Sequence, residues 1–178
     1  MLQLNMNQAQ NQDEIFDVVD DNDQVIRQAT RGEVHREGLL HRAVHVIVTN
    51  SAGELLMQKR SMKKDAAPGK WTSSCSGHVD SGEDYDESAM RELGEELAIF
   101  IKNKDELEFL FKQSACEETG NEFVKIYRLT YDGEVEFNKN EIDAVQWISS
   151  DEIEAWLLRD PAAIDRPFKL IFNWLSNE

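Results

Sequence analysis

The sequence predicts one α/β domain in which helices cover both faces of a mixed, curved β-sheet. Short apolar runs with strand character recur along the chain, stretches of helical periodicity separate them, and no repeat or interior linker divides the 178 residues. Hydrophobic residues make up 40% of the chain and charged residues 30%, which is the composition of a globular protein. A chain of this length buries a sizeable core without the help of disulfide bonds.

The start of the chain differs from the rest. Residues 1–12 are rich in Asn and Gln, and we expect a flexible tail there, followed by a single domain over residues 13–178. The tail lacks the basic and apolar regions of a signal peptide, and the longest apolar run, residues 43–48, is too short to cross a bilayer. Cys75 and Cys116 are too few for a disulfide framework. We therefore expect a cytoplasmic protein.

The first half of the domain predicts mainly strands. Apolar residues on both sides of an Asp/Asn cluster at residues 20–23 predict a hairpin. Residues 43–48 predict a buried strand, which turns at residues 50–53 and returns along residues 54–60. The small polar residues of 71–79 fit either a closely packed strand or a binding loop.

The second half alternates between helices and strands. Asp84 as an N-cap, with Glu87 three residues later, predicts a helix whose apolar side carries Leu93 and Leu97. The remaining predicted elements are strands at 106–113, 123–131 and 144–148, a helix from Ser149 through Leu158, and an amphipathic helix at 168–175.

The net charge narrows the classes of partner. Lys and Arg number 19 against 35 Asp and Glu, which gives −16 with neutral histidines. A field of this sign repels nucleic-acid backbones and anionic lipid, so neither a nucleic-acid polymer nor a membrane is an expected partner. A small anionic substrate fits only where cations neutralise it locally, and a divalent metal ion is the obvious cation.

One predicted helix gathers carboxylates. Glu92, Glu95 and Glu96 stand at i, i+3 and i+4, so they share one helix face, and Arg91 lies four residues before Glu95. Like charges this close repel one another unless a cation sits among them. Hard oxygen ligands of this kind suit Mg²⁺ or Mn²⁺. Three glutamates alone more often form a solvated helix face, so the surrounding string decides between the two interpretations.

That string is Gly77, five residues, Glu83, seven residues, and then Arg91-Glu92-Leu93-Gly94-Glu95-Glu96-Leu97-Ala98-Ile99. It resembles the Nudix box, G-x5-E-x7-R-E-U-x-E-E-x-G-U, where U is an aliphatic residue. The departure is Ala98, where the family has glycine. Alanine in a left-handed turn out of the helix costs on the order of 1 kcal/mol, so the exit from the helix is in question more than the chemistry.

The resemblance implies a Nudix-like α/β/α sandwich and a divalent-metal-dependent hydrolase of a diphosphate joined to another group. Carried over by position, Glu92, Glu95, Glu96 and the carbonyl of Gly77 would bind Mg²⁺ or Mn²⁺. Glu83 and Arg91 would hold the loop and the helix in register. Glu141 stands where some relatives carry a late glutamate that serves as the general base.

Within that superfamily the chain is similar to the branch that contains isopentenyl-diphosphate isomerase. The matching segments are Leu40-His41-Arg42-Ala43, Pro68-Gly69-Lys70-Trp71-Thr72, Gly77-His78 and Asn121-Glu122-Phe123. By this resemblance His41, His78 and Glu122 would belong to a metal cage, with His35 as a further histidine whose spacing to His41 is one residue short.

Two departures from the isomerase favour hydrolysis. Ser76 stands in place of the catalytic cysteine, and Cys75, one residue earlier, points to the opposite face of an extended segment. Gly120 stands in place of the second acid of the cage. An isomerase-like activity is thus the alternative. An inactive Nudix-like binding module is a third possibility, disfavoured because the helix keeps all its glutamates.

Candidate substrate contacts lie outside the helix. The basic cluster before Trp71 suits an anionic substrate, whereas His45, inside a strand, is expected to be a core or cross-strand histidine. The candidate substrate-binding residues are Lys59, Arg60, Lys70, Trp71, His41 and His78. The expected partner is a small-molecule diphosphate, and family analogy allows a homodimer.

Overall fold

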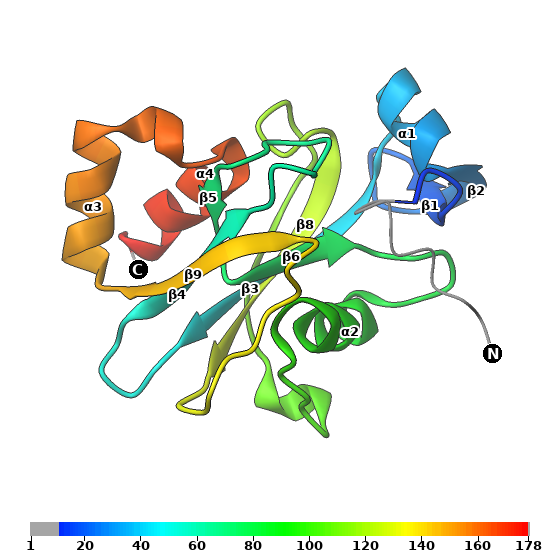
Figure 1. Cartoon of the computed structure of the whole chain (residues 1–178). Coiled ribbons are helices and arrows are strands. Elements are labelled where there is room, and N and C mark those ends of the chain that lie inside the picture. The colour runs from blue at the N-terminus through cyan, green and yellow to red at the C-terminus, as the bar shows by residue number, and fades with distance from the viewer. Residues whose placement is uncertain (1–10, 178) are drawn as a thin grey trace.

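The computed structural model describes residues 11–177 and contains an α/β fold built on a seven-stranded mixed sheet (Figure 1). The predicted tail lies outside the described residues, except for Asn11 and Gln12. The strands are β1 (Ile15–Val19), β2 (Val25–Thr30), β3 (His41–Thr49), β4 (Leu55–Arg60), β5 (Trp71–Thr72), β6 (Cys75–His78), β7 (Glu108–Gln113), β8 (Glu122–Thr130) and β9 (Ile142–Ile148). The helices are α1 (Arg31–Glu37), α2 (Tyr85–Leu97), α3 (Ser150–Arg159) and α4 (Arg166–Leu175), with 3-10 turns at Lys104–Glu106 and Pro161–Ala163.

Strand β3 organises the sheet. It runs parallel to β8 along its whole length, and it pairs with β4 only where Thr49 faces Leu55. Beyond that point the two strands diverge, because β3 takes β6 as its antiparallel partner while β4 pairs with β5 and β9. The divergence places β6, a short strand of small polar residues, beside the carboxylate helix α2.

The two faces of the sheet carry separate apolar clusters. Val44, Val46 and Val48 of β3 belong to a cluster that packs on α2, whereas the alternate residues Ala43 and Ile47 belong to one that packs on α3 and α4. Figure 1 shows α2 on one side of the sheet and α3 and α4 on the other. The predicted sandwich with helices on both faces is confirmed.

Helix α1 is an element that the sequence analysis missed. It spans seven residues, its Thr30 N-cap accepts a hydrogen bond from the Glu33 amide, and Gly38 ends it with a φ of 63°. Of its apolar residues only Val34 is buried, in a small cluster with Phe16 and Val18 of the hairpin β1–β2. A helix this short shows no apolar periodicity, so only its capping residues could have predicted it from the sequence.

Helix α2 begins and ends as its sequence indicates. Asp84 and Glu87 form a reciprocal capping box at the start. At the end Ala98 adopts the left-handed conformation, with φ 52° and ψ 29°, and its amide donates to the carbonyl of Leu93. Ala98 thus adopts the left-handed conformation that glycine favours, and the chain leaves the helix as it would with glycine at this position.

Candidate functional site

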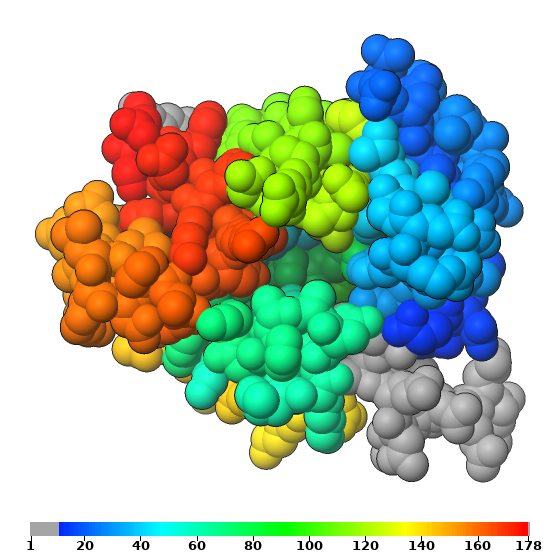
Figure 2. Space-filling view, turned by 90° about the horizontal axis from the view of Figure 1, so that it is seen from above, coloured from blue at the N-terminus to red at the C-terminus, as the bar shows by residue number. Residues whose placement is uncertain are grey.

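A cavity of about 1250 Å³ opens on one face of the molecule. Figure 2 looks down on this face and shows a hollow ringed by α1 in blue, the loop at 61–70 in teal, the loop at 114–121 in lime and the segment leading into α4 in orange. Residues of β3 and β6 line its floor, and Glu92 and Glu95 of α2 reach it from the side. Segments far apart in the sequence therefore meet around one space.

Two carboxylates of α2 lie beside β6, where Glu96 is buried and Glu92 is partly buried with 12% of its side chain exposed. Glu96 is 1% exposed, and its Oε2 accepts hydrogen bonds from Gln58 Nε2 at 2.7 Å and from the Ser76 amide at 3.1 Å. Glu92 lies against Gly77 so closely that a Cβ at Gly77 would come within 2.0 Å of the Glu92 carboxyl group. Glu95 is different, because its side chain is 57% exposed at the edge of the cavity.

The surroundings of Glu92 and Glu96 favour the binding of a cation. Burial raises the pKa of Glu92 well above its ordinary value, and the neighbouring Glu96 raises it further. Burial also raises the pKa of Glu96, with Lys64 opposing the shift and Glu141 adding to it. Clustered buried oxygens beside a glycine that leaves room for them are the donor set that a hard divalent ion takes. The residues present therefore fit the metal that the resemblance implies.

Arg91 ties the helix to the loop before it. Its guanidinium donates to Glu83 Oε2 at 3.0 Å, to Glu92 Oε1 at 2.7 Å and to the carbonyl of His78 at 3.0 Å. Although burial opposes the charge, the hydrogen bonds with Glu83 and the charge of Glu92 raise the pKa of Arg91. Arg91 thus fixes the Glu92 carboxylate and the end of β6 relative to each other.

Glu141 approaches the same group from the segment before β9. Its Oε2 accepts a hydrogen bond from Lys64 Nζ at 2.6 Å, and its Oε1 accepts one from Asn138 Nδ2 at 3.2 Å. Lys64 Nζ also lies 4.0 Å from Glu96 Oε1, and its side chain is only 7% exposed. A buried lysine therefore bridges Glu96 and Glu141, and both it and Glu141 line the cavity.

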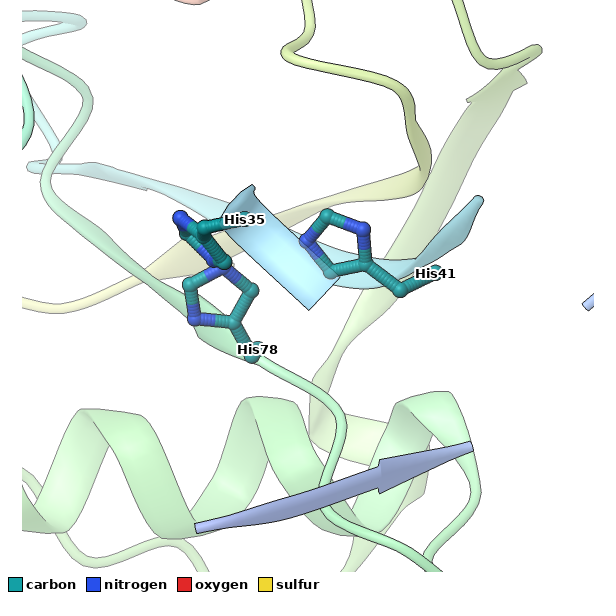
Figure 3. Close-up of side chains that lie close together, drawn as sticks. All are labelled: His35, His41 and His78. Carbon is teal, nitrogen blue, oxygen red and sulfur yellow. The ribbon is translucent and has the colours of Figure 1, made fainter. Parts of the chain in front are cut away.

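A second group of metal-ligating side chains stands at the α1 end of the cavity. His35, His41 and His78 each offer a nitrogen, and these atoms lie within 4.8 Å of one another. Figure 3 shows the three imidazoles converging from α1, β3 and β6. Glu122 Oε1 lies 3.1 Å from His78 Nε2 and 3.5 Å from His41 Nε2. Helix α1 brings His35 to the group despite its shorter spacing to His41.

The hydrogen bonds of these histidines define their protonation. Arg31 donates to His78 Nδ1 at 3.0 Å, so the His78 proton is on Nε2 and points to Glu122. Burial lowers the pKa of His78 to about 4, which keeps this ring neutral at pH 7. Burial opposes ionisation of Glu122 as well, yet the neighbouring imidazoles of His41 and His78 hold its pKa below the ordinary value.

His41 carries an unused nitrogen. Its Nδ1 donates to the carbonyl of Leu39 at 2.9 Å, which leaves the lone pair of Nε2 facing the cluster. Within residues 11–177 this buried Nε2 has no hydrogen-bond partner. A buried nitrogen of this kind, aimed at two other histidines and a carboxylate, fits a metal ligand.

Comparison with known proteins agrees with this arrangement. Residues 39–170 match the family model of the NUDIX domain. The chain belongs to the Nudix family. It is 33% identical to an uncharacterized Nudix hydrolase of Nostoc sp. over 92% of this chain and 97% of that protein. It is also 32% identical to isopentenyl-diphosphate Delta-isomerase 2 of Photorhabdus laumondii, over 92% of this chain and 93% of the relative.

Solved structures show the same relationship. The crystal structure of DR0079 from Deinococcus radiodurans superimposes with a TM-score of 0.77 at 30% identity, and covers 89% of this chain and 97% of that one. The Nudix fold and the isomerase-containing branch, both inferred from the box and its flanks, are confirmed. No helix within residues 11–177 is long and apolar enough to cross a membrane.

Within this Nudix fold, some predicted substrate contacts reach the cavity and others do not. Arg60, Lys70 and His78 line it. Lys59, Trp71 and His41 are not among its lining residues. Trp71 packs against Trp156 of α3, with ring centroids 5.4 Å apart, at the edge of the apolar cluster beneath α3 and α4. Neither Lys59 nor Trp71 is placed to contact a substrate in the cavity.

The Nudix site also contains residues that sequence reasoning missed. Lys64 belongs to the basic cluster before Trp71, and its place between Glu96 and Glu141 depends on the fold of the loop at 61–70. His45 was expected in the core or across a strand. It is 5% exposed, yet it lines the floor of the cavity opposite Ser76. Neither contact has a local signal in the sequence.

Proposed function

We propose that this protein is an Mg²⁺- or Mn²⁺-dependent Nudix diphosphohydrolase, which cleaves the P–O–P linkage of a nucleoside-diphosphate-linked or similar small molecule. The observation that supports the proposal is the packing of the buried Glu96 and the partly buried Glu92 against β6, where Gly77 leaves room for a carboxylate. Removing two neighbouring glutamates from solvent without a function would be costly, because each charge must be neutralised or partnered.

In this proposal Glu92, Glu95, Glu96 and the Gly77 carbonyl hold the divalent ion. When bound, such an ion screens the diphosphate charge and lowers the pKa of the attacking water. Arg91 orients Glu92 through its 2.7 Å hydrogen bond and acts as a positioning residue. Glu95, exposed at the mouth of the cavity, accepts a hydrogen bond from Arg91 at 3.3 Å.

The remaining roles fall to residues on the other walls. Arg60, Lys64 and Lys70 supply the positive charge that the diphosphate needs in a chain of net charge −16. Glu141 is the general base of the proposal, since its carboxylate lines the cavity and is oriented by Lys64 and Asn138.

The test combines a substrate panel with one variant. We expect ³¹P NMR with Mg²⁺ to show new phosphate or monophosphate resonances for one class among nucleoside diphosphates, nucleotide sugars and dinucleotide cofactors. Glu96→Gln should lower kcat/KM on that substrate by about 100-fold or more, since a lost ligand costs at least as much as a lost outer partner. Mn²⁺ binding measured by EPR should weaken in parallel.

Glu154→Gln is the matched control, because Glu154 is an exposed glutamate on α3, away from the cavity. It should keep full activity and Mn²⁺ affinity. If Glu96→Gln retains the activity and metal affinity of the parent protein, the ligand assignment is wrong. If no diphosphate in the panel is cleaved, the hydrolase proposal itself is wrong.

The histidine group supports a second candidate, an isomerase acting on a prenyl diphosphate. His35, His41 and Glu122 offer the mixed nitrogen and oxygen donors that suit Mn²⁺ or Zn²⁺, and His78 would join them if a metal ion displaced its Nε2 proton. The isomerase candidate is less well supported by the side chains that could donate a proton. Cys75 is fully buried in the α2 cluster, and burial raises the pKa of its thiol well above the ordinary value. Conversion of isopentenyl diphosphate without P–O cleavage would establish this candidate over hydrolysis.

A further inference from the structure

The floor of the cavity carries a polar pair that the diphosphate chemistry does not use. His45 of β3 and Ser76 of β6 face each other directly in the antiparallel ladder. Directly opposed residues of such a ladder project their side chains on the same face of the sheet. Both residues line the cavity. The imidazole and the hydroxyl therefore stand side by side on its floor.

The His45 ring is held in place from behind. Its Nδ1 lies 2.6 Å from the hydroxyl of Ser73, which is itself fully buried. In either tautomer this contact uses one nitrogen and leaves Nε2 with one hydrogen-bonding function. Among the residues that the structure describes, Nε2 has no hydrogen-bond partner. Burial lowers the pKa of His45, so the ring is neutral at pH 7.

The pair lies next to the proposed diphosphate site. The backbone amide of Ser76 donates to Glu96 Oε2 at 3.1 Å, so the same residue touches the carboxylate group through its amide and the cavity floor through its side chain. Ile164 and Asp165, just before α4, line the cavity as well. The floor is therefore within reach of a substituent on a diphosphate bound at Glu92 and Glu96.

We infer that His45 and Ser76 form a subsite for a polar substituent of the diphosphate, such as a hydroxyl or amide group of a sugar or nucleoside, and that this subsite discriminates against hydrocarbon substituents. The inference rests on the proposed function and adds a substrate class to it. A prenyl chain on this floor would leave a buried imidazole and a hydroxyl without partners, and unpaired buried polar groups lower affinity. A sugar or nucleoside would satisfy both.

The test compares three analogues that share a non-hydrolysable P–CH₂–P core. These are methylenebisphosphonate itself, α,β-methylene-ADP and the dimethylallyl ester of methylenebisphosphonate. Titration calorimetry with Mg²⁺ gives the affinity of each, and the bare core isolates the contribution of the substituent. For the parent protein we expect α,β-methylene-ADP to bind more tightly than the bare core. We expect the dimethylallyl ester to bind more weakly than α,β-methylene-ADP by on the order of tenfold.

Two variants test whether His45 and Ser76 cause the preference for the nucleoside over the prenyl substituent. His45→Leu should reduce the ratio of nucleoside to prenyl affinity by about tenfold, and Ser76→Ala by a smaller factor, while binding of the bare core stays within about twofold. His45→Asn keeps a hydrogen-bonding group and should retain most of the preference. Thermal unfolding checks that each variant folds. If His45→Leu does not fold, Ser76→Ala alone tests the inference.

The outcomes separate the two proposals. If the bare core binds but the ratio is the same in the parent, His45→Leu and Ser76→Ala proteins, the subsite inference is wrong and the hydrolase proposal stands. A parent protein that prefers the dimethylallyl analogue also overturns the inference. If the bare core fails to bind with Mg²⁺, the proposed function fails and the subsite inference falls with it.

Discussion

Gly77 is the residue at which a missing side chain matters most to the site. A Cβ there would lie 2.0 Å from the Glu92 carboxyl, well inside the contact distance of any pair of atoms. Its partner across the ladder is Val44, so the strand cannot move away without disturbing the core beneath it. Glu92 itself is held by Arg91. The glycine of the Nudix box thus has a steric reason in this fold.

Gly77→Ala should therefore displace the Glu92 carboxylate and lower metal-dependent activity by about 100-fold, with little loss of secondary structure. The measurement is kcat/KM on the substrate found by NMR, together with Mn²⁺ affinity. Gly32→Ala is the control, because a Cβ there meets its nearest atom only at 3.4 Å. Full activity of Gly77→Ala would show that Glu92 does not need this position.

Single residues also show how strand geometry sorts neighbouring side chains. Cys75 and Ser76 are adjacent, yet Cys75 is buried in the α2 cluster while Ser76 lines the cavity. The period of two along an extended strand had predicted this separation from the sequence. That His45 faces Ser76 was not predictable, because the register between β3 and β6 is a property of the sheet.

Helix α2 ends at a residue whose backbone conformation costs free energy. Ala98 ends the helix in the left-handed conformation, and the carbonyl of Leu93 accepts hydrogen bonds from the amides of Ala98 and Ile99. The carboxylates precede this cap, so the substitution of alanine for glycine leaves their face intact. What it changes is the free energy of the turn.

Ala98→Gly should stabilise the protein by about 1 kcal/mol, because glycine adopts this conformation without the Cβ penalty. Urea unfolding followed by circular dichroism measures the difference. Ala155→Gly is the matched control, since Ala155 is exposed in the interior of α3, and there the same exchange should destabilise by about 0.5–1 kcal/mol. Loss of stability in both variants would refute the strain assigned to Ala98.

One of the contacts that hold the hairpin β1–β2 against the sheet is made by the carboxylate of Asp23. Asp23, in the turn of the hairpin, accepts hydrogen bonds from Arg42 Nε at 2.6 Å, from the Tyr85 hydroxyl at 2.8 Å and from Lys112. Burial alone would raise its pKa, but these donors together hold the pKa of Asp23 below the ordinary value. This element therefore depends on an ionised group.

Asp23→Asn should cost about 2 kcal/mol of unfolding free energy at pH 7, since hydrogen bonds to a charged group are lost. A depressed native pKa gives stability that is present above the unfolded pKa of about 3.9 and is lost as the pH falls through the native value. The difference between parent and variant should accordingly shrink below about pH 4. Asparagine tolerates the φ of 59° at this position.

Asp21→Asn controls for the removal of charge, because Asp21 is an exposed residue of the same turn. Its urea midpoint should follow that of the parent protein at every pH. An Asp23→Asn difference that stays constant from pH 7 to pH 3 would show that packing, rather than ionisation, accounts for the loss.

Across the whole molecule, negative charge is in excess. The chain carries −16, and although Arg31, Arg60, Lys64, Lys70 and Arg166 line the cavity, acidic residues outnumber the basic ones there as well. This excess of like charge opposes compaction. A bound divalent cation would therefore add to the local positive charge that an anion needs.

Added salt should consequently raise the thermal midpoint of the metal-free protein. Raising NaCl from about 10 mM to about 100 mM shortens the Debye length from about 30 Å to about 10 Å and screens this repulsion. Differential scanning fluorimetry in the presence of a chelator measures the change, and choline chloride should act equally if the effect is screening. A lower midpoint in salt would mean that local ion pairs outweigh the net repulsion.

Residue spacing was enough to predict the family, the α/β sandwich, the capping boxes of α2 and α3 and the helix face that carries Glu92, Glu95 and Glu96. These features depend on spacings of two to eight residues, which local geometry sets. Three contacts became visible in the folded chain: His35 joins His41, Lys64 bridges Glu96 and Glu141, and His45 faces Ser76. Those contacts join segments that strand register and loop closure bring together, and periodicity along one segment carries no information about them.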